Sequence, residues 1–305
     1  ILKMTASTLI ILNPHAGSGR AGAIWREIEP TLWKHMGEVI VAVTQHPDEV
    51  ARHIQQAYNV GVRRVIALGG DGTNHSLVNA LAEFNQKHNP PMIYGNIPVG
   101  TGRDWARGQG IPYTDPQRIA QWIIGAKPTP TDVGMVTSGA TREYFLNIAS
   151  TGLGGEVVKR VNATKQRRPW TFLLSTILTT LSYEPQPVQV KIDGEDWYEG
   201  TAYAVAVANG SSFGHGMKIA PNANTSDGLF EVVLVKGVSR LTVLTALQRV
   251  YNATHLTHPA VMSTRGKSVS VVSPRGLIDM ELDGEFNEGR EVTFTVHPGL
   301  LQMLL

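Results

Sequence analysis

The sequence predicts an α/β domain followed by a β-rich domain, and three observations support this fold class. Over residues 1–130, short apolar runs alternate with glycine loops and helical patterns, as in a parallel sheet with helices on both faces. Pro128-Thr129-Pro130 then interrupts the alternation. Beyond these prolines most segments have the pattern of strands. We therefore expect a three-layer αβα domain over residues 1–130 and a β-sandwich-like domain over residues 131–291.

The first domain is predicted to contain four parallel strands. Each is a mainly apolar run, which is typical of strands buried on both faces of a sheet; the runs are residues 8–12, 39–43, 62–66 and 92–97. Helices are expected between and after them. The first has an apolar face of Ile24, Trp25 and Ile28, and the second covers residues 47–58. The third is indicated by the helical spacing of Leu77, Val78, Leu81 and Phe84. The fourth covers residues 115–124 and begins with Asp115-Pro116.

The second domain is predicted to be mostly strands with two helical insertions. The strands expected there are residues 132–136, 144–148, 188–192 and 202–207. One more strand, residues 292–296, is expected near the end of the chain, outside this domain. The helices are expected at residues 157–168 and 170–183.

Composition excludes several classes of protein. The chain has 305 residues, 42% of them hydrophobic and 17% charged, which is typical of a soluble globular protein. A net charge of +2 does not indicate a nucleic-acid partner. No cysteine is present, so disulfides and thiolate metal sites are excluded, which fits a reducing cytoplasm. No leader is visible, and the apolar run at 170–178 is too short to span a bilayer. We expect a cytoplasmic protein with at most peripheral membrane contact.

The most informative stretch is the glycine turn at residues 67–73. It lies between the strand at 62–66 and the helix pattern that begins with Leu77. Gly69, Gly70 and Gly72 around Asp71 let the backbone approach an anionic ligand, and the following helix directs free N–H groups to the same place. A phosphate site is the functional interpretation. The structural alternative is a tight left-handed turn capped by Asp71 or Thr73.

Gly69-Gly70-Asp71-Gly72-Thr73 resembles the nucleotide-binding signature of the diacylglycerol kinase catalytic family. That family includes bacterial lipid kinases and sphingosine kinases and is more distantly similar to NAD kinases. Further matches run in family order from Asn13 to Glu285. The resemblance implies a nucleotide-binding α/β domain, a β-sandwich-like substrate domain, and a return of residues 292–305 to the first domain. It also implies ATP and Mg²⁺ as cofactors.

The resemblance implies a nucleotide cleft. Besides the glycine turn, the loops after the first and fourth strands and the end of the second strand would contact the nucleotide. The contacting residues it implies are Asn13, Thr44, Gly69, Gly70, Asp71, Gly72, Thr73 and Thr101. Asp71 would also help to organise the catalytic Mg²⁺. The sequence departs from the family at Arg103, where asparagine is usual, and at His75 and Ser76, where asparagine and glutamate are common.

One competing motif is disfavoured. Gly17, Gly19 and Gly22 have the spacing of a dinucleotide fingerprint. That fingerprint also needs an acid at the end of the second strand, where Thr44-Gln45 stands instead.

Residues 220–229 resemble the metal-binding stretch of the family. The resemblance implies Mg²⁺ held by the carboxylate of Asp227 and the backbone oxygens of Asn224 and Leu229. Oxygen ligands on a tight loop suit such a hard cation. Without the resemblance, a plain Asp-Gly hairpin turn is the favoured interpretation.

Two Asp-Gly-Glu turns compete for the role of catalytic base. Asp193-Gly194-Glu195 and Asp283-Gly284-Glu285 both read as hairpin turns, and local sequence does not rank them. The resemblance selects Glu285 as the proton acceptor, reaching the cleft from the second domain with a pKa set by burial. It gives Asp283 no defined role.

A basic stretch precedes an apolar helix pattern. The residues concerned are Lys159, Arg160, Lys165, Arg167 and Arg168, followed by Trp170, Phe172, Leu173 and Leu174. Basic side chains beside exposed aromatic ones suit an anionic membrane surface, whereas the structural alternative is a solvated helix face followed by a core helix.

Taken together, these patterns predict an ATP- and Mg²⁺-dependent lipid kinase that phosphorylates diacylglycerol or a related phospholipid at the membrane. The alternatives are a soluble NAD kinase-like enzyme and a non-catalytic regulator that binds nucleotide or lipid. The expected partners are ATP and a lipid, without nucleic acid. The sequence leaves the oligomeric state open, a homodimer included.

Overall fold

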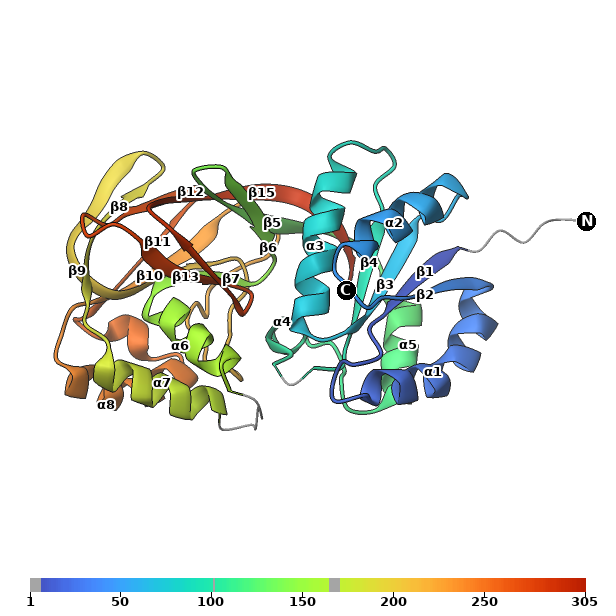
Figure 1. The fold of residues 1–305 in the computed structure, drawn as a ribbon, viewed down its shortest axis with the longest axis horizontal. Helices are drawn as coiled ribbons and strands as arrows, with labels where there is room; N and C mark the ends of the chain where they lie inside the picture. Colours follow the sequence, from blue (N-terminus) through green and yellow to red (C-terminus); the bar gives the residue numbers. More distant parts are fainter. Residues whose placement is uncertain (1–6, 101, 165–170) are drawn as a thin grey trace, which may run out of the picture. The chain divides into compact units, whose positions relative to one another are not determined.

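The computed structural model describes residues 7–100, 102–164 and 171–305, which form two compact units. Unit 1 is the chain up to Thr131 together with Gly299–Leu305, and unit 2 is Asp132–Pro298. Each unit contains both strands and helices (Figure 1).

Unit 1 is built on a parallel sheet, as predicted. Its strands lie in the order β2-β1-β3-β4-β15. Their bounds are β1 Thr8–Leu12, β2 Val39–Val43, β3 Arg64–Gly69, β4 Ile93–Pro98 and the end of β15 Glu291–Leu304. β1, β3 and β4 are buried along almost their whole length, because helices cover both faces of the sheet.

The helices of unit 1 form the two outer layers (Figure 1). α1 (Arg20–Met36) and α5 (Pro116–Gly125) pack on the face that carries Ile10 and Ile66. α2 (Glu49–Asn59) and α3 (Asp71–Asn85) pack on each other and on β1 and β3. A short helix, α4 (Asp104–Gly108), follows β4. The three-layer prediction is confirmed.

Unit 2 is an antiparallel, β-sandwich-like domain, as predicted. Pairing runs β14-β13-β7-β9-β8-β12-β15, β10 pairs with β9 and β11, and β5 pairs with β6 and β15. The bounds are β5 Pro128–Ser138, β6 Thr141–Phe145, β7 Ile148–Gly152, β8 Gln186–Ile192, β9 Glu195–Ala208, β10 Phe230–Lys236, β11 Val261–Gly266, β12 Ser268–Val272, β13 Ile278–Leu282 and β14 Glu285–Gly289. Phe145, Phe230 and Phe294 pack together in its core.

Three helices of unit 2 lie together in Figure 1: α6 (Leu153–Asn162), α7 (Thr171–Ser182) and α8 (Arg240–Tyr251). The turn η1 (His255–Thr257) follows α8. α6 begins earlier than the predicted helix at 157–168 and ends at Asn162. Its first turn contains Gly154 and Gly155, whose missing side chains allow close contact with Ser150 and Asp279. Lys165, Arg167, Arg168 and Trp170 lie outside the described residues.

The predicted strand at 144–148 is wrong, because the chain divides there into β6 and β7. The carboxylate of Asp283 accepts hydrogen bonds from the backbone N–H groups of Leu146 (2.7 Å), Asn147 (2.8 Å) and Ile148 (3.1 Å). These amides therefore turn towards one side chain rather than along a strand ladder.

The return to unit 1 also differs from the prediction. Residues 292–295 of β15 still pair with β12 in unit 2, and the chain joins unit 1 only at Gly299. Gln302 and Met303 then pair with β4. No helix in the described part of the chain combines the length and apolarity needed to cross a bilayer.

We expect Asp283→Ala to lower the free energy of unfolding by about 2–4 kcal/mol, because three partly buried amides lose their acceptor. Asp193→Ala is the matched control. Asp193 also has φ 52° and accepts from only two amides, those of Lys267 and Ser268, at exposed positions. Chemical denaturation measures both losses, and an equal loss in the two variants would contradict the role given to Asp283.

Candidate functional site

The glycine turn joins β3 to α3 as the sequence predicts. Gly69 ends β3, Gly70 is extended (φ −90°, ψ −172°), and α3 begins at Asp71. No side chain caps this helix, since the N-cap residue is Gly70. The N-terminus of a 15-residue helix therefore faces the end of the sheet, an arrangement that favours an anion.

Gly69 has no room for a side chain. A Cβ atom on Gly69 would lie 2.5 Å from both Cβ and Oγ1 of Thr73. The Thr73 hydroxyl in turn accepts a hydrogen bond from the Asn13 amide (3.0 Å), and the Asn13 backbone N–H donates to the carbonyl of Leu68 (3.1 Å). The glycine at 69 thus allows the loop after β1 and the first turn of α3 to be tied together.

A second glycine loop lies against the first. A Cβ on Gly100 would be 3.0 Å from the Cα of Gly70, and one on Gly102 would be 2.2 Å from a carboxylate oxygen of Asp71. The Arg103 backbone N–H donates to Oδ1 of Asp71 (3.2 Å). The loop therefore positions Asp71. Thr101, predicted as a nucleotide contact, lies outside the described residues.

Arg103 occupies the left-handed region (φ 56°), which asparagine tolerates better than arginine. Its backbone still binds Asp71, so this departure from the family keeps that contact. Burial, and secondly the charge of Arg20, lowers the pKa of the Arg103 guanidinium.

A cavity of about 280 Å³ opens at the carboxyl ends of β1, β2 and β3. Five predicted contacts line it: Asn13, Thr44, Gly70, Gly72 and Thr73. Gly69 and Asp71 belong to the same turn but do not line the cavity.

Sequence reasoning missed other side chains in this cavity, His15, Gln45 and His46. Their only sequence signal is that each follows a strand end. Of the two departures in α3, Ser76 lines the cavity and donates to the carbonyl of Gly72 (2.9 Å), whereas His75 is buried beside Asn79.

In unit 2, the two Asp-Gly-Glu turns are built alike. Asp193 and Asp283 both have φ 52°, and both bind backbone amides of a neighbouring segment. Glu195 and Glu285 are both exposed at the start of a strand, so the expected burial of Glu285 is not observed. Structure within unit 2 therefore does not rank the two glutamates.

A buried carboxylate that sequence reasoning missed stands four residues before Glu285. Glu281 is 2% exposed, accepts from the Ser150 hydroxyl (3.0 Å) and accepts from the Gly284 backbone N–H (2.9 Å). It therefore supports the turn that carries Glu285.

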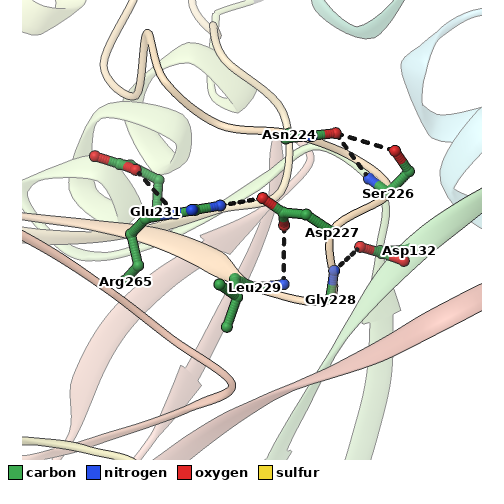
Figure 2. Close-up of polar contacts among 8 residues, drawn as sticks. All are labelled: Asp132, Asn224, Ser226, Asp227, Gly228, Leu229, Glu231 and Arg265. Carbon is green, nitrogen blue, oxygen red and sulfur yellow. Dashed lines mark hydrogen bonds and ion pairs between the residues drawn. The ribbon is translucent and has the colours of Figure 1, made fainter.

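The loop predicted to hold a metal ion is drawn in Figure 2. One carboxylate oxygen of Asp227 binds the guanidinium of Arg265, and the other accepts from the Leu229 backbone N–H (3.1 Å). The Asn224 side chain accepts from the N–H and hydroxyl of Ser226 (3.1 Å each).

No group of three or more acidic, histidine or cysteine side chains suited to a metal ion occurs in the described ranges. The guanidinium of Arg265 binds the Asp227 carboxylate, and its positive charge repels a second cation there, so this arrangement does not fit Mg²⁺.

Unit 2 also contains an almost entirely apolar cavity of about 130 Å³. It lies between strands β7, β9 and β10 and helices α6, α7 and α8. Lining side chains include Val157, Phe172, Val243, Ala246, Leu247 and Val250. Phe172 is half-buried and lines this cavity.

Comparison with known proteins agrees with this architecture. Residues 7–136 match the model of the diacylglycerol kinase catalytic domain, and residues 147–305 match that of the YegS C-terminal NAD kinase beta sandwich-like domain. A crystal structure of a diacylglycerol kinase from Bacillus anthracis shares the fold, with a TM-score of 0.73 and 21% identity over 100% of this chain and 98% of that one.

Curated relatives cover nearly the whole chain. A diacylglycerol kinase of Mycobacterium tuberculosis is 29% identical over 310 residues, 99% of this chain and 94% of that protein. The Enterobacter protein named "Probable lipid kinase YegS-like" is 27% identical over 305 residues, 98% of this chain and 95% of that protein. The chain therefore belongs to the diacylglycerol kinase family, as a kinase in which a catalytic domain is joined to a YegS-type C-terminal domain.

Proposed function

We propose that this kinase transfers the γ-phosphoryl group of ATP, with Mg²⁺, to the hydroxyl group of a lipid, most simply diacylglycerol or a related phospholipid. Membership of a kinase family implies ATP use. The observation that carries the lipid assignment is the apolar cavity of unit 2, because a dinucleotide or other polar acceptor would find no partners there.

Unit 1 supports the nucleotide half of the proposal. The cavity at the ends of β1, β2 and β3 is lined by backbone at Gly70 and Gly72 and by short polar side chains. Glycines allow the phosphates to approach the backbone, and the N-terminus of α3 stabilises their charge. Asn13 and Thr73 hold each other in place, so the wall of the site is preorganised.

Asp71 is the residue we assign to the catalytic Mg²⁺. Its carboxylate is exposed, an oxygen ligand of the kind Mg²⁺ prefers, and Arg103 and Gly102 fix its position. When bound with the nucleotide, Mg²⁺ neutralises charge that develops on the phosphates. The fixed negative charge of Asp71 would hold this Mg²⁺ in position.

The apolar cavity supports an acyl chain. Its volume of about 130 Å³ is close to that of apolar cavities that hold one benzene molecule, so it accepts a segment of a chain rather than a whole lipid. α8 covers the cavity although none of its residues is fully buried. A cover packed so lightly requires little energy to move aside for the rest of the chain.

α7 has its polar and apolar faces reversed relative to an ordinary core helix. Its buried residues are Ser175, Thr176, Thr179 and Thr180, whereas Leu173, Leu174, Leu178 and Leu181 are 39–49% exposed. Lys159 and Arg160 are exposed on α6, which packs against α7. An apolar helix face beside basic side chains suits an anionic membrane surface, where the lipid is found.

Glu285 is the residue we assign as proton acceptor, a role that rests on the family resemblance. As the lipid hydroxyl oxygen bonds to the γ-phosphorus of ATP, the bond to the bridging oxygen breaks and ADP leaves, and the hydroxyl proton passes to the carboxylate of Glu285. Gly284, held by the buried Glu281, fixes the turn on which Glu285 stands.

Labelled ATP with Mg²⁺ should transfer phosphate to at least one of diacylglycerol, phosphatidylglycerol, a sphingoid base or a prenol in mixed micelles. Glu285→Gln should lower kcat by roughly 10²–10⁴-fold through loss of the base. Glu195→Gln, on the equivalent turn, is the matched control and should keep the wild-type kcat. Labelling of NAD instead, or ATP binding without transfer to any acceptor, would exclude the lipid-kinase proposal.

Membrane binding should depend on the exposed leucines of α7. Leu174→Ser combined with Leu178→Ser should weaken binding to phosphatidylglycerol vesicles at least about tenfold, because two large apolar side chains leave the interface. Val60→Ser removes an apolar side chain that is 59% exposed in unit 1 and should not change binding. Vesicle sedimentation gives the affinities, and equal effects in both variants would argue against a docking role for α7.

A further inference from the structure

The loop before β10 is organised around a guanidinium group. Arg265 stands on β11 directly opposite Glu231 on β10. Its guanidinium binds the carboxylate of Asp227 and lies 3.7 Å, Nε to Oε2, from Glu231 (Figure 2). One guanidinium thus offsets part of the charge of two carboxylates that lie four residues apart, one in the loop and one on β10.

Burial makes this cation necessary. The Glu231 side chain is 5% exposed, and its Oε2 has no hydrogen-bond partner among the described residues. The Asp227 carboxylate is 24% exposed. Burial raises the pKa of Glu231, the Arg265 guanidinium lowers it, and the Asp227 carboxylate raises it, so Arg265 favours the charged form of Glu231 against the other two.

The positive charge beside Asp227 is the guanidinium of Arg265. One oxygen of Asp227 accepts from Arg265 and the other from the N–H of Leu229, so the guanidinium occupies the side of this carboxylate where a cation would bind. The resemblance of residues 220–229 to a metal-binding stretch implies Mg²⁺ at this carboxylate. In this chain an arginine from the neighbouring strand stands there instead.

We propose that Arg265 is the resident cation of this loop and replaces the structural Mg²⁺ that the family resemblance implies. The ion pair with Asp227 connects β11 to the loop before β10. The same guanidinium offsets negative charge at buried Glu231. Since the cation is part of the chain, the loop keeps its structure when free Mg²⁺ is absent.

The test is thermal unfolding by calorimetry without nucleotide, so that kinase activity and ATP binding do not enter. In wild-type protein, the melting temperature in EDTA should equal that in millimolar Mg²⁺ at matched ionic strength. Arg265→Met should lower the melting temperature in EDTA by roughly 3–6 °C. Millimolar Mg²⁺ should restore at least half of that loss, because the two freed carboxylates then bind the ion.

Two further variants complete the design. Arg265→Lys keeps a cation and should remain insensitive to Mg²⁺, which also covers the case in which Arg265→Met fails to fold. Lys191→Met removes an exposed ion pair with Asp196 on the β8–β9 hairpin and should leave the melting temperature unchanged. Stabilisation of the wild-type protein by Mg²⁺, or an Arg265→Met variant that Mg²⁺ does not stabilise, would overturn the proposal.

Discussion

The proposed nucleotide site of unit 1 depends on one close approach, that of the Gly69 backbone to the side chain of Thr73. Parallel pairing of β1 with β3 brings Leu12 and Leu68 into register, so the loops that follow them begin side by side. Thr73 can then meet Asn13 only because residue 69 has no Cβ. The same glycine turn starts α3, and with it the helix N-terminus that we assign to the phosphates.

Unit 2 uses a different principle, in which charged side chains hold turns and apolar side chains line a cavity. Asp283 holds the β6–β7 bend, Glu281 holds the turn that carries Glu285, and Arg265 balances the loop before β10. Two helices of unit 2, α7 and α8, have unusual surfaces. α7 buries threonines and exposes leucines, and α8 covers an apolar cavity without a fully buried residue.

Local patterns predicted the parts of the fold that depend on local physics. Continuous apolar runs predicted the parallel strands of unit 1. Of the predicted nucleotide contacts that the structure describes, five line one cavity, and Gly69 and Asp71 do not. Long-range contacts account for the errors. The division at Phe145 and Ile148 is imposed by Asp283, more than 130 residues away. Arg265 meets Asp227 across 38 residues, and no spacing rule relates them.

Calorimetric titration of ATP into Gly69→Ala tests the central claim most directly, with Gly22→Ala as the control. A methyl group at position 69 must displace Thr73 and its hydrogen bond with Asn13, whereas Gly22 lies in α1 with nothing within 4 Å of the added atom. We predict that Gly69→Ala raises the Kd for ATP at least about tenfold and that Gly22→Ala leaves it unchanged. Unaltered ATP affinity in Gly69→Ala would contradict the assignment of the glycine turn as the nucleotide site.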